Sequence, residues 1–161
     1  MSRNWRDLAK QRPDPLLRFY WDISFNTPVG PIPPEFVEEV HVPLPKFESD
    51  SATFQARRLY FAKFEDFGVT TVKFYVDVNG QVITWLRRWQ SKIKSDNGNY
   101  SVPSAYKGTV TVMSEDPIGQ TMNTFVMKGV FPTQIPSIPF GSTGEIITLD
   151  VEFSIDSVLI Q

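Results

Sequence analysis

The sequence contains no cysteine and only one histidine, His41. Disulfides, cysteine-ligated metals and iron–sulfur clusters are therefore excluded, and so is any metal site that needs several histidines. Phosphate-binding loops, dinucleotide-binding glycine motifs and serine nucleophile elbows are also missing. We interpret His41, which lies between Val40 and Val42, as a half-exposed strand residue. These absences predict a protein that is not an enzyme and that uses no metal and no cofactor.

Charge of one sign and long apolar runs are lacking as well. The chain has 16 basic and 18 acidic side chains, a net charge of −2, so it has no broad basic field to hold nucleic acid by counterion release. No stretch approaches the roughly 20 apolar residues that span a bilayer, and the polar N-terminus does not resemble a signal peptide. We expect a soluble protein that is made in the cytoplasm and has no membrane partner.

Alternation of apolar and polar side chains with period two, the pattern of strands, dominates the 161 residues. It predicts about seven strands, at residues 16–25, 36–43, 53–64, 69–77, 105–113, 122–131 and 145–159. One helix is predicted at residues 80–94, where Asp77 or Asn79 can cap the start and apolar side chains recur with helical spacing. Because the length suits one domain, we predict an N-terminal arm at 1–15 and a single mainly β domain at 16–161. Its architecture should be a sandwich or barrel with one flanking helix.

Residues 46–52 are a polar stretch between two predicted strands. The stretch is longer than a usual hairpin tip of two to five residues, so we predict a functional loop there. Trp5 lies in the polar arm, and an exposed tryptophan is stabilised when it docks on a neighbour. We therefore expect contacts between subunits at Trp5, Leu8, Phe47, Glu48 and Asp50.

Two groups of charged residues allow more than one interpretation. Asp150 and Glu152 share a face of the last predicted strand, where a carboxylate pair could serve a glycosidase; we favour the solvated face of an amphipathic strand. A basic patch near the end of the predicted helix either complements the helix dipole or binds a partner. Its members are Arg87, Arg88, Lys92 and Lys94.

Several short motifs follow one another in a fixed order. They are Val42-Pro43-Leu44-Pro45, a strand at 67–77 leading into a helix with Trp89-Gln90-Ser91, Ala105-Tyr106-Lys107, the run Met127 to Thr133, and Gly144-Glu145-Ile146 before a closing alternating strand. In this order, over residues 16–158, they resemble the tail tube protein family of contractile phages (myoviruses). The sequence departs from that pattern in its proline-rich stretch at 26–35, and in Phe131, where the family often has tryptophan.

The resemblance implies a tail tube-like β subunit of which six copies close into a hexameric ring, with rings stacked into a tube. Its implied partners are further copies of itself, the tail sheath, and baseplate and tail-terminator proteins. Double-stranded DNA would pass through the lumen without specific binding, and the protein would be part of the virion tail, assembled in the host cytoplasm. Because a wall that lets DNA slide should not bind phosphates, we predict that Asp150 and Glu152 face the lumen.

Three other functions remain open at this stage. A baseplate or tube-initiator ring would have the same fold, and so would the tube of a type VI-like contractile injection system. A ligand-binding β-sandwich belongs to a different class and would line a cleft with its aromatic side chains. A small hydrolase does not fit, because its catalytic residues are lacking.

Overall fold

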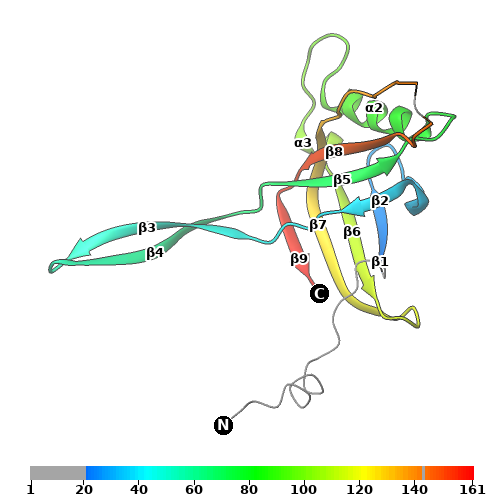
Figure 1. Ribbon diagram of the computed structural model, residues 1–161. Helices are drawn as coiled ribbons and strands as arrows, with labels where there is room; N and C mark the ends of the chain where they lie inside the picture. Colours follow the sequence, from blue (N-terminus) through cyan, green and yellow to red (C-terminus); the bar gives the residue numbers. More distant parts are fainter. Residues whose placement is uncertain (1–20, 143) are drawn as a thin grey trace.

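The computed structural model describes residues 21–142 and 144–161, which form a mainly β structure with one long helix (Figure 1). The predicted arm at residues 1–15 lies outside the described residues. The strands are β1 Trp21–Asn26, β2 Val37–Val40, β3 Lys46–Phe54, β4 Arg57–Asp66, β5 Val69–Tyr75, β6 Gly108–Glu115, β7 Thr121–Gln134, β8 Thr148–Ser154 and β9 Ser157–Ile160. The helices are the short 3-10 helix η1 Pro34–Phe36, α2 Gln81–Ile93 and α3 Pro103–Tyr106.

Seven of these strands form one antiparallel sheet in the order β1-β6-β7-β8-β5-β2, with β9 also paired to β7. Strand β7 is long, and it pairs with β6 and β9 before Val130 and with β8 after it. It therefore divides the sheet into two halves, which run in crossing directions in Figure 1. Sheet halves that cross in this way enclose a core between their inner faces. The predicted mainly β fold with one flanking helix is confirmed.

Helix α2 closes this core with two tryptophans. The Trp85 ring lies edge-on to Phe25 of β1 at 5.2 Å, and the Trp89 ring lies 5.6 Å from Phe153 of β8. Both indole N–H groups are satisfied: Trp85 Nε1 donates to the Gly30 carbonyl at 3.0 Å and Trp89 Nε1 donates to the Tyr106 carbonyl at 2.6 Å. Buried tryptophans need such partners, so these two bonds fix how the helix sits on the sheet.

The predicted helix at 80–94 is confirmed, and one of its two predicted caps is found. The Asp77 carboxylate accepts a hydrogen bond from the Gln81 backbone N–H through Oδ1, at 2.8 Å. Asp77 thereby satisfies one of the backbone donors that the first turn of a helix leaves without a partner.

Several strand predictions were wrong at their boundaries; the predicted strand at 105–113, for example, begins within α3, and the one at 36–43 ends at Val40. The predicted loop at 46–52 is part of strand β3, and the predicted strand at 53–64 is interrupted by a turn at Gln55 and Ala56. Both turn residues have positive φ values, 47° and 63°, as in the tight turns that match the twist of a hairpin. Glycine or asparagine usually occupies such turns, and neither is present at these two positions, so the sequence did not indicate a turn. The predicted strand at 145–159 is likewise divided between β8 and β9.

An ion pair stabilises the chain between β8 and β9, and its carboxylate packs against a glycine of β7. Lys107 Nζ lies 2.7 Å from Asp156 Oδ2, and the Asp156 carboxyl group packs against Gly129 of β7. Gly129 has a φ of +69°, and a Cβ at this position would overlap the carboxylate. A side chain at residue 129 therefore meets two obstacles, the backbone conformation and Asp156.

We expect Gly129→Ala to lower the free energy of unfolding by roughly 2–3 kcal/mol. The matched control is Gly119→Ala, because Gly119 also has positive φ (+84°) but has open space around it. The control should cost only about 1 kcal/mol, the price of the backbone conformation alone. Urea denaturation of the two variants measures the difference, and equal losses would show that Asp156 does not restrict this position.

Candidate assembly interface

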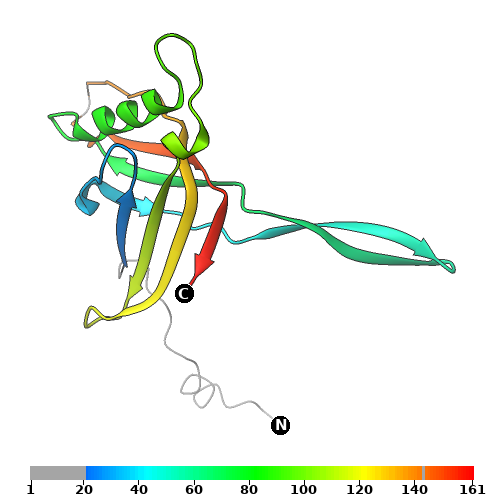
Figure 2. The ribbon, with the colours of Figure 1, turned by 180° about the vertical axis from the view of Figure 1, so that it is seen from behind.

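Strands β3 and β4 form a two-stranded hairpin that extends away from the rest of the chain (Figures 1 and 2). Every residue of both strands is exposed. Six large apolar side chains on the hairpin are between 50% and 70% exposed: Phe47, Phe54, Leu59, Tyr60, Phe61 and Phe64. Isolated large apolar side chains are common on protein surfaces, but a concentration of this kind marks an interaction site.

The pairing of the strands sorts these side chains onto two faces. Residues directly opposite each other in an antiparallel pair point to the same side, and neighbours along a strand point to opposite sides. Ala52 is paired with Leu59, Asp50 with Phe61, and Phe54 with Arg57. We call this side the apolar face, with the members Ala52, Phe54, Leu59 and Phe61 beside Asp50 and Arg57.

The other side of the hairpin is polar. Thr53 is paired with Arg58, Ser51 with Tyr60, and Ser49 with Ala62. We call this side the polar face. The register shifts between Phe47 and Ser49, where β4 has one extra residue, so the alternation of Phe64 and Lys63 is not continuous with that of Phe61.

A hairpin of this kind is poorly stabilised on its own. An isolated two-stranded ribbon is at best marginally stable in water, because no third strand or helix covers its side chains. The turn adds to the cost, since Gln55 and Ala56 both adopt a left-handed backbone conformation, at roughly 1 kcal/mol or more each. A surface that covers the apolar face would supply the missing stabilisation.

The structure places three of the five predicted contact residues on this hairpin. Phe47, Glu48 and Asp50 all lie on β3 and are exposed, although in a strand and not in the predicted loop. Trp5 and Leu8 lie outside the described residues. Leu59 and Phe61 were not predicted as contact residues, because the turn at 55–56 and the bulge in β4 interrupt the alternation of side chains in residues 53–64.

The predicted lumen residues lie on a different surface, the outer face of the half formed by β2, β5 and β8. Asp150 and Glu152 alternate with the buried Leu149, Val151 and Phe153, which confirms that the two carboxylates share the side away from the core. Asp150 pairs across the strands with Lys73, whose Nζ lies 3.9 Å from Glu39 Oε2. That this face lines a lumen remains a prediction.

Other predicted positions are placed as follows. His41 follows β2, its side chain is 67% exposed, and its Nε2 lies 3.1 Å from Glu39 Oε1. The basic residues of α2 are exposed, and Lys94 Nζ lies 5.3 Å from the centre of the Tyr100 ring.

Within residues 21–142 and 144–161, no group of three or more His, Cys, Asp or Glu side chains is arranged to hold a metal ion. None of the helices described is long and apolar enough to cross a membrane.

No family model matches the sequence, and no curated protein sequence matches it. Several solved structures, in contrast, are similar to this chain. The chain is similar to one in the extended-state sheath/tube terminator of PVC, an extracellular contractile injection system, with a TM-score of 0.71 and 16% identity, covering 94% of this chain and 98% of the other. It is also similar to one in the tube-terminating cap of the anti-feeding prophage, with a TM-score of 0.74, 14% identity and 93% coverage of both chains.

A third similar chain comes from the sheath–tube complex of PVC in the extended state, with a TM-score of 0.67, 16% identity and 99% coverage of both chains. At such low identities the likeness concerns the fold. It extends over nearly the whole length of each chain, so the expected tail tube-like fold is confirmed. Hexameric assembly is a separate matter that a single chain does not decide.

We expect the double variant Phe54→Ser/Leu59→Ser to change the free energy of unfolding by no more than about 0.5 kcal/mol, because both side chains are exposed and leave the core intact. The control Phe74→Ser, at a fully buried position, should cost roughly 3–5 kcal/mol. Urea denaturation should be carried out at a concentration at which the protein sediments as a monomer. A large loss in the double variant would mean that the hairpin packs on its own body.

Proposed function

We propose that this chain is a structural subunit of a tube in a contractile tail, in which six copies close into a ring and the rings stack. The observation that carries the proposal is the fully exposed hairpin, whose apolar face has no cover in the part of the chain that the structure describes. The tail tube-like fold supports it, as do the similar chains from tube, terminator and cap assemblies. The role is structural and not catalytic.

The strand order supports assembly by a second route. Strands β1 and β2 end the path of the seven-stranded sheet, so neither has a strand partner on its outer side within residues 21–142 and 144–161. Unpaired edges are sites for association with other chains, and closing several copies into a barrel removes them. Stacking of rings is a heterologous contact that does not close on itself, and it therefore produces a tube.

The tube would conduct a phage genome during ejection. In this proposal the partners are further copies of the chain, the sheath, and baseplate and terminator proteins, and the place of action is the virion tail. Double-stranded DNA would pass without specific binding, along a wall that includes the acidic residues Asp150 and Glu152.

Two variants of this function are favoured by particular observations. Two of the similar structures are of a terminator and a cap, which makes a single closing ring the second candidate beside a repeating tube. The same structures come from injection systems, which favours a cargo other than DNA. Copy number in the purified particle separates a terminator ring from a tube, and the particle's contents separate the two cargoes.

Electron microscopy of the concentrated protein tests self-assembly. We expect rings or tubes of uniform width from the wild type. In Leu59→Ser/Phe61→Ser the concentration needed for assembly should rise at least about tenfold, which corresponds to a loss of about 1.4 kcal/mol of binding free energy per contact. Tyr60→Ser is the matched control, since it removes an exposed aromatic ring from the polar face of the same strand. A wild type that remains a single compact particle at every concentration contradicts the proposal.

The lumen assignment is tested by reversing charge. Assembled Asp150→Lys/Glu152→Lys should retain double-stranded DNA at low salt and release it as salt is raised, whereas the wild-type assembly should not retain it. The control Glu35→Lys/Asp96→Lys makes the same charge change at exposed positions on other surfaces and should behave like the wild type. If both double variants retain DNA equally, the face that contains Asp150 does not line the lumen.

A further inference from the structure

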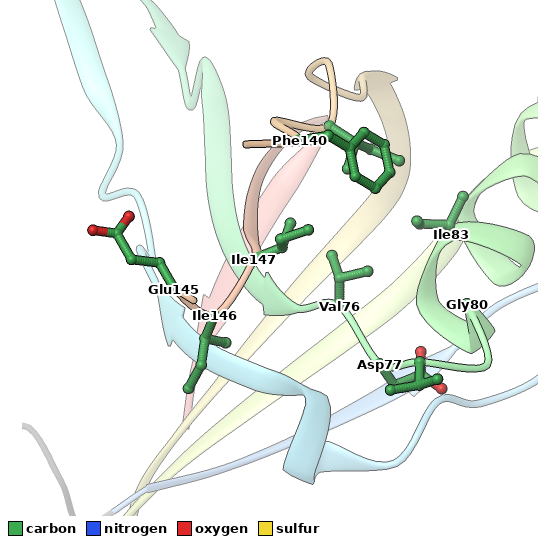
Figure 3. Close-up of a pocket in the computed structure, with 10 residues that line it drawn as sticks. Val76, Asp77, Gly80, Ile83, Phe140, Glu145, Ile146 and Ile147 are labelled. Atoms are coloured by element: carbon green, nitrogen blue, oxygen red, sulfur yellow. The ribbon is translucent and has the colours of Figure 1, made fainter. Parts of the chain in front are cut away.

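An apolar groove lies at the end of β5, where the chain leaves the sheet and enters α2 (Figure 3). Its volume is about 500 Å³, within the range of 300–1,000 Å³ that suits a bound molecule or side chains. Side chains from the connection between β5 and α2, from α2 and from residues between β7 and β8 form its walls: Val76, Ile83, Ile138, Phe140, Ile146 and Ile147. Phe140 and Ile146 are 85% and 75% exposed, so the groove presents apolar surface to solvent.

Two carboxylates accompany this apolar surface. Glu145 lines the groove and is exposed. Asp77 lines it too; its Oδ1 caps α2, but its Oδ2 is buried and has no hydrogen-bond partner among the described residues. Because Asp77 Oδ2 is buried within the single copy, Glu145 is the carboxylate that a cationic donor of a second molecule can reach. The groove is thus suited to an apolar group with a positive charge beside it.

The hairpin presents such a combination at its tip. Phe54 and Arg57 are directly opposite each other, so an aromatic ring and a guanidinium project from the same face. Both are exposed, and they flank the turn at Gln55 and Ala56, the point of the hairpin farthest from the sheet. The guanidinium can donate to carboxylates while the ring enters an apolar cavity.

We infer that the hairpin tip of one copy docks in the groove of the next, with Phe54 among the apolar walls and Arg57 facing Glu145 at the rim. The hairpin tip lies at the start of β4 and the groove lies past the end of β5, so the two surfaces are at opposite ends of the run formed by these two strands (Figure 1). Opposite placement means that neither surface of one copy blocks the other. Copies joined this way follow head to tail, the arrangement that rings and stacks both require. This inference rests on the proposed self-assembly and names the surfaces that carry it.

A charge exchange tests the contact. Arg57→Glu and Glu145→Arg should each raise the concentration needed for assembly at least tenfold, and the double variant should recover most of that loss because the pair is restored with opposite signs. The matched control is Arg58→Glu, which makes the same change one residue away on the polar face and should assemble like the wild type. Asp77 is left unchanged in these variants because it caps α2.

A second readout does not depend on complete assembly. Because the chain has no cysteine, single cysteines can be introduced without interference. Under mild oxidation, Gln55→Cys mixed with Val78→Cys, a groove residue, should form a disulfide-linked dimer at least tenfold faster than Gln55→Cys mixed with Ile118→Cys. Val78 and Ile118 are both exposed, so accessibility does not favour the groove.

The outcomes separate this inference from the proposed function. If Leu59→Ser/Phe61→Ser prevents assembly while Glu145→Arg and the crosslinking pair behave like their controls, the hairpin docks elsewhere and the inference is overturned, but the tube function stands. If the wild type does not assemble, and Gln55→Cys mixed with Val78→Cys crosslinks no faster than the Ile118→Cys control, both fail. Recovery in the charge-exchanged double variant, together with the fast crosslink, supports the groove as the docking site.

Discussion

A two-stranded ribbon cannot bury its own side chains, and this constraint governs what hairpin β3–β4 can do. Its apolar face needs a third surface, and no described residue of the same chain provides one. The body, by contrast, has its core enclosed by two halves of a sheet and a helix. The chain therefore consists of a stable body and an extension whose stability depends on another molecule. In the proposed function, that molecule is another copy of the same chain.

The body matters for assembly because it holds the hairpin in place. Strand β5 continues from the hairpin into the sheet, where Phe74 is fully buried and its ring lies 6.1 Å from that of Trp85. Trp85 and Trp89 in turn fix α2 over the two sheet halves, and the groove lies where β5 leads into this helix (Figure 3). The same packing thus sets the positions of the hairpin, the groove and the outer face with Asp150. The proposed assembly, in which the same contacts repeat from copy to copy, requires that rigidity.

The sequence predicted the parts that depend on local periodicity. The helix was found because Val82, Leu86 and Trp89 repeat with helical spacing, and β8 was found because Leu149, Val151 and Phe153 alternate with polar residues. The hairpin was not found, because residues 46–52 are mostly small and polar, which resembles a loop, and because Gln55 and Ala56 are unusual turn residues. A strand exposed on both faces has no burial pattern to detect. The groove joins the connection after β5, helix α2, and residues 138, 140 and 145–147, which only the tertiary structure brings together.

The central claim is that a second copy covers the apolar face of the hairpin, and amide hydrogen exchange on β3 and β4 tests it most directly. In the dilute monomer these amides should exchange almost as fast as in an unfolded chain, because a lone ribbon opens readily. In the assembled protein the amides of residues 50–61 should become strongly protected, while those of β8 should be protected in both states. Equal exchange of the hairpin amides in monomer and assembly would contradict the account.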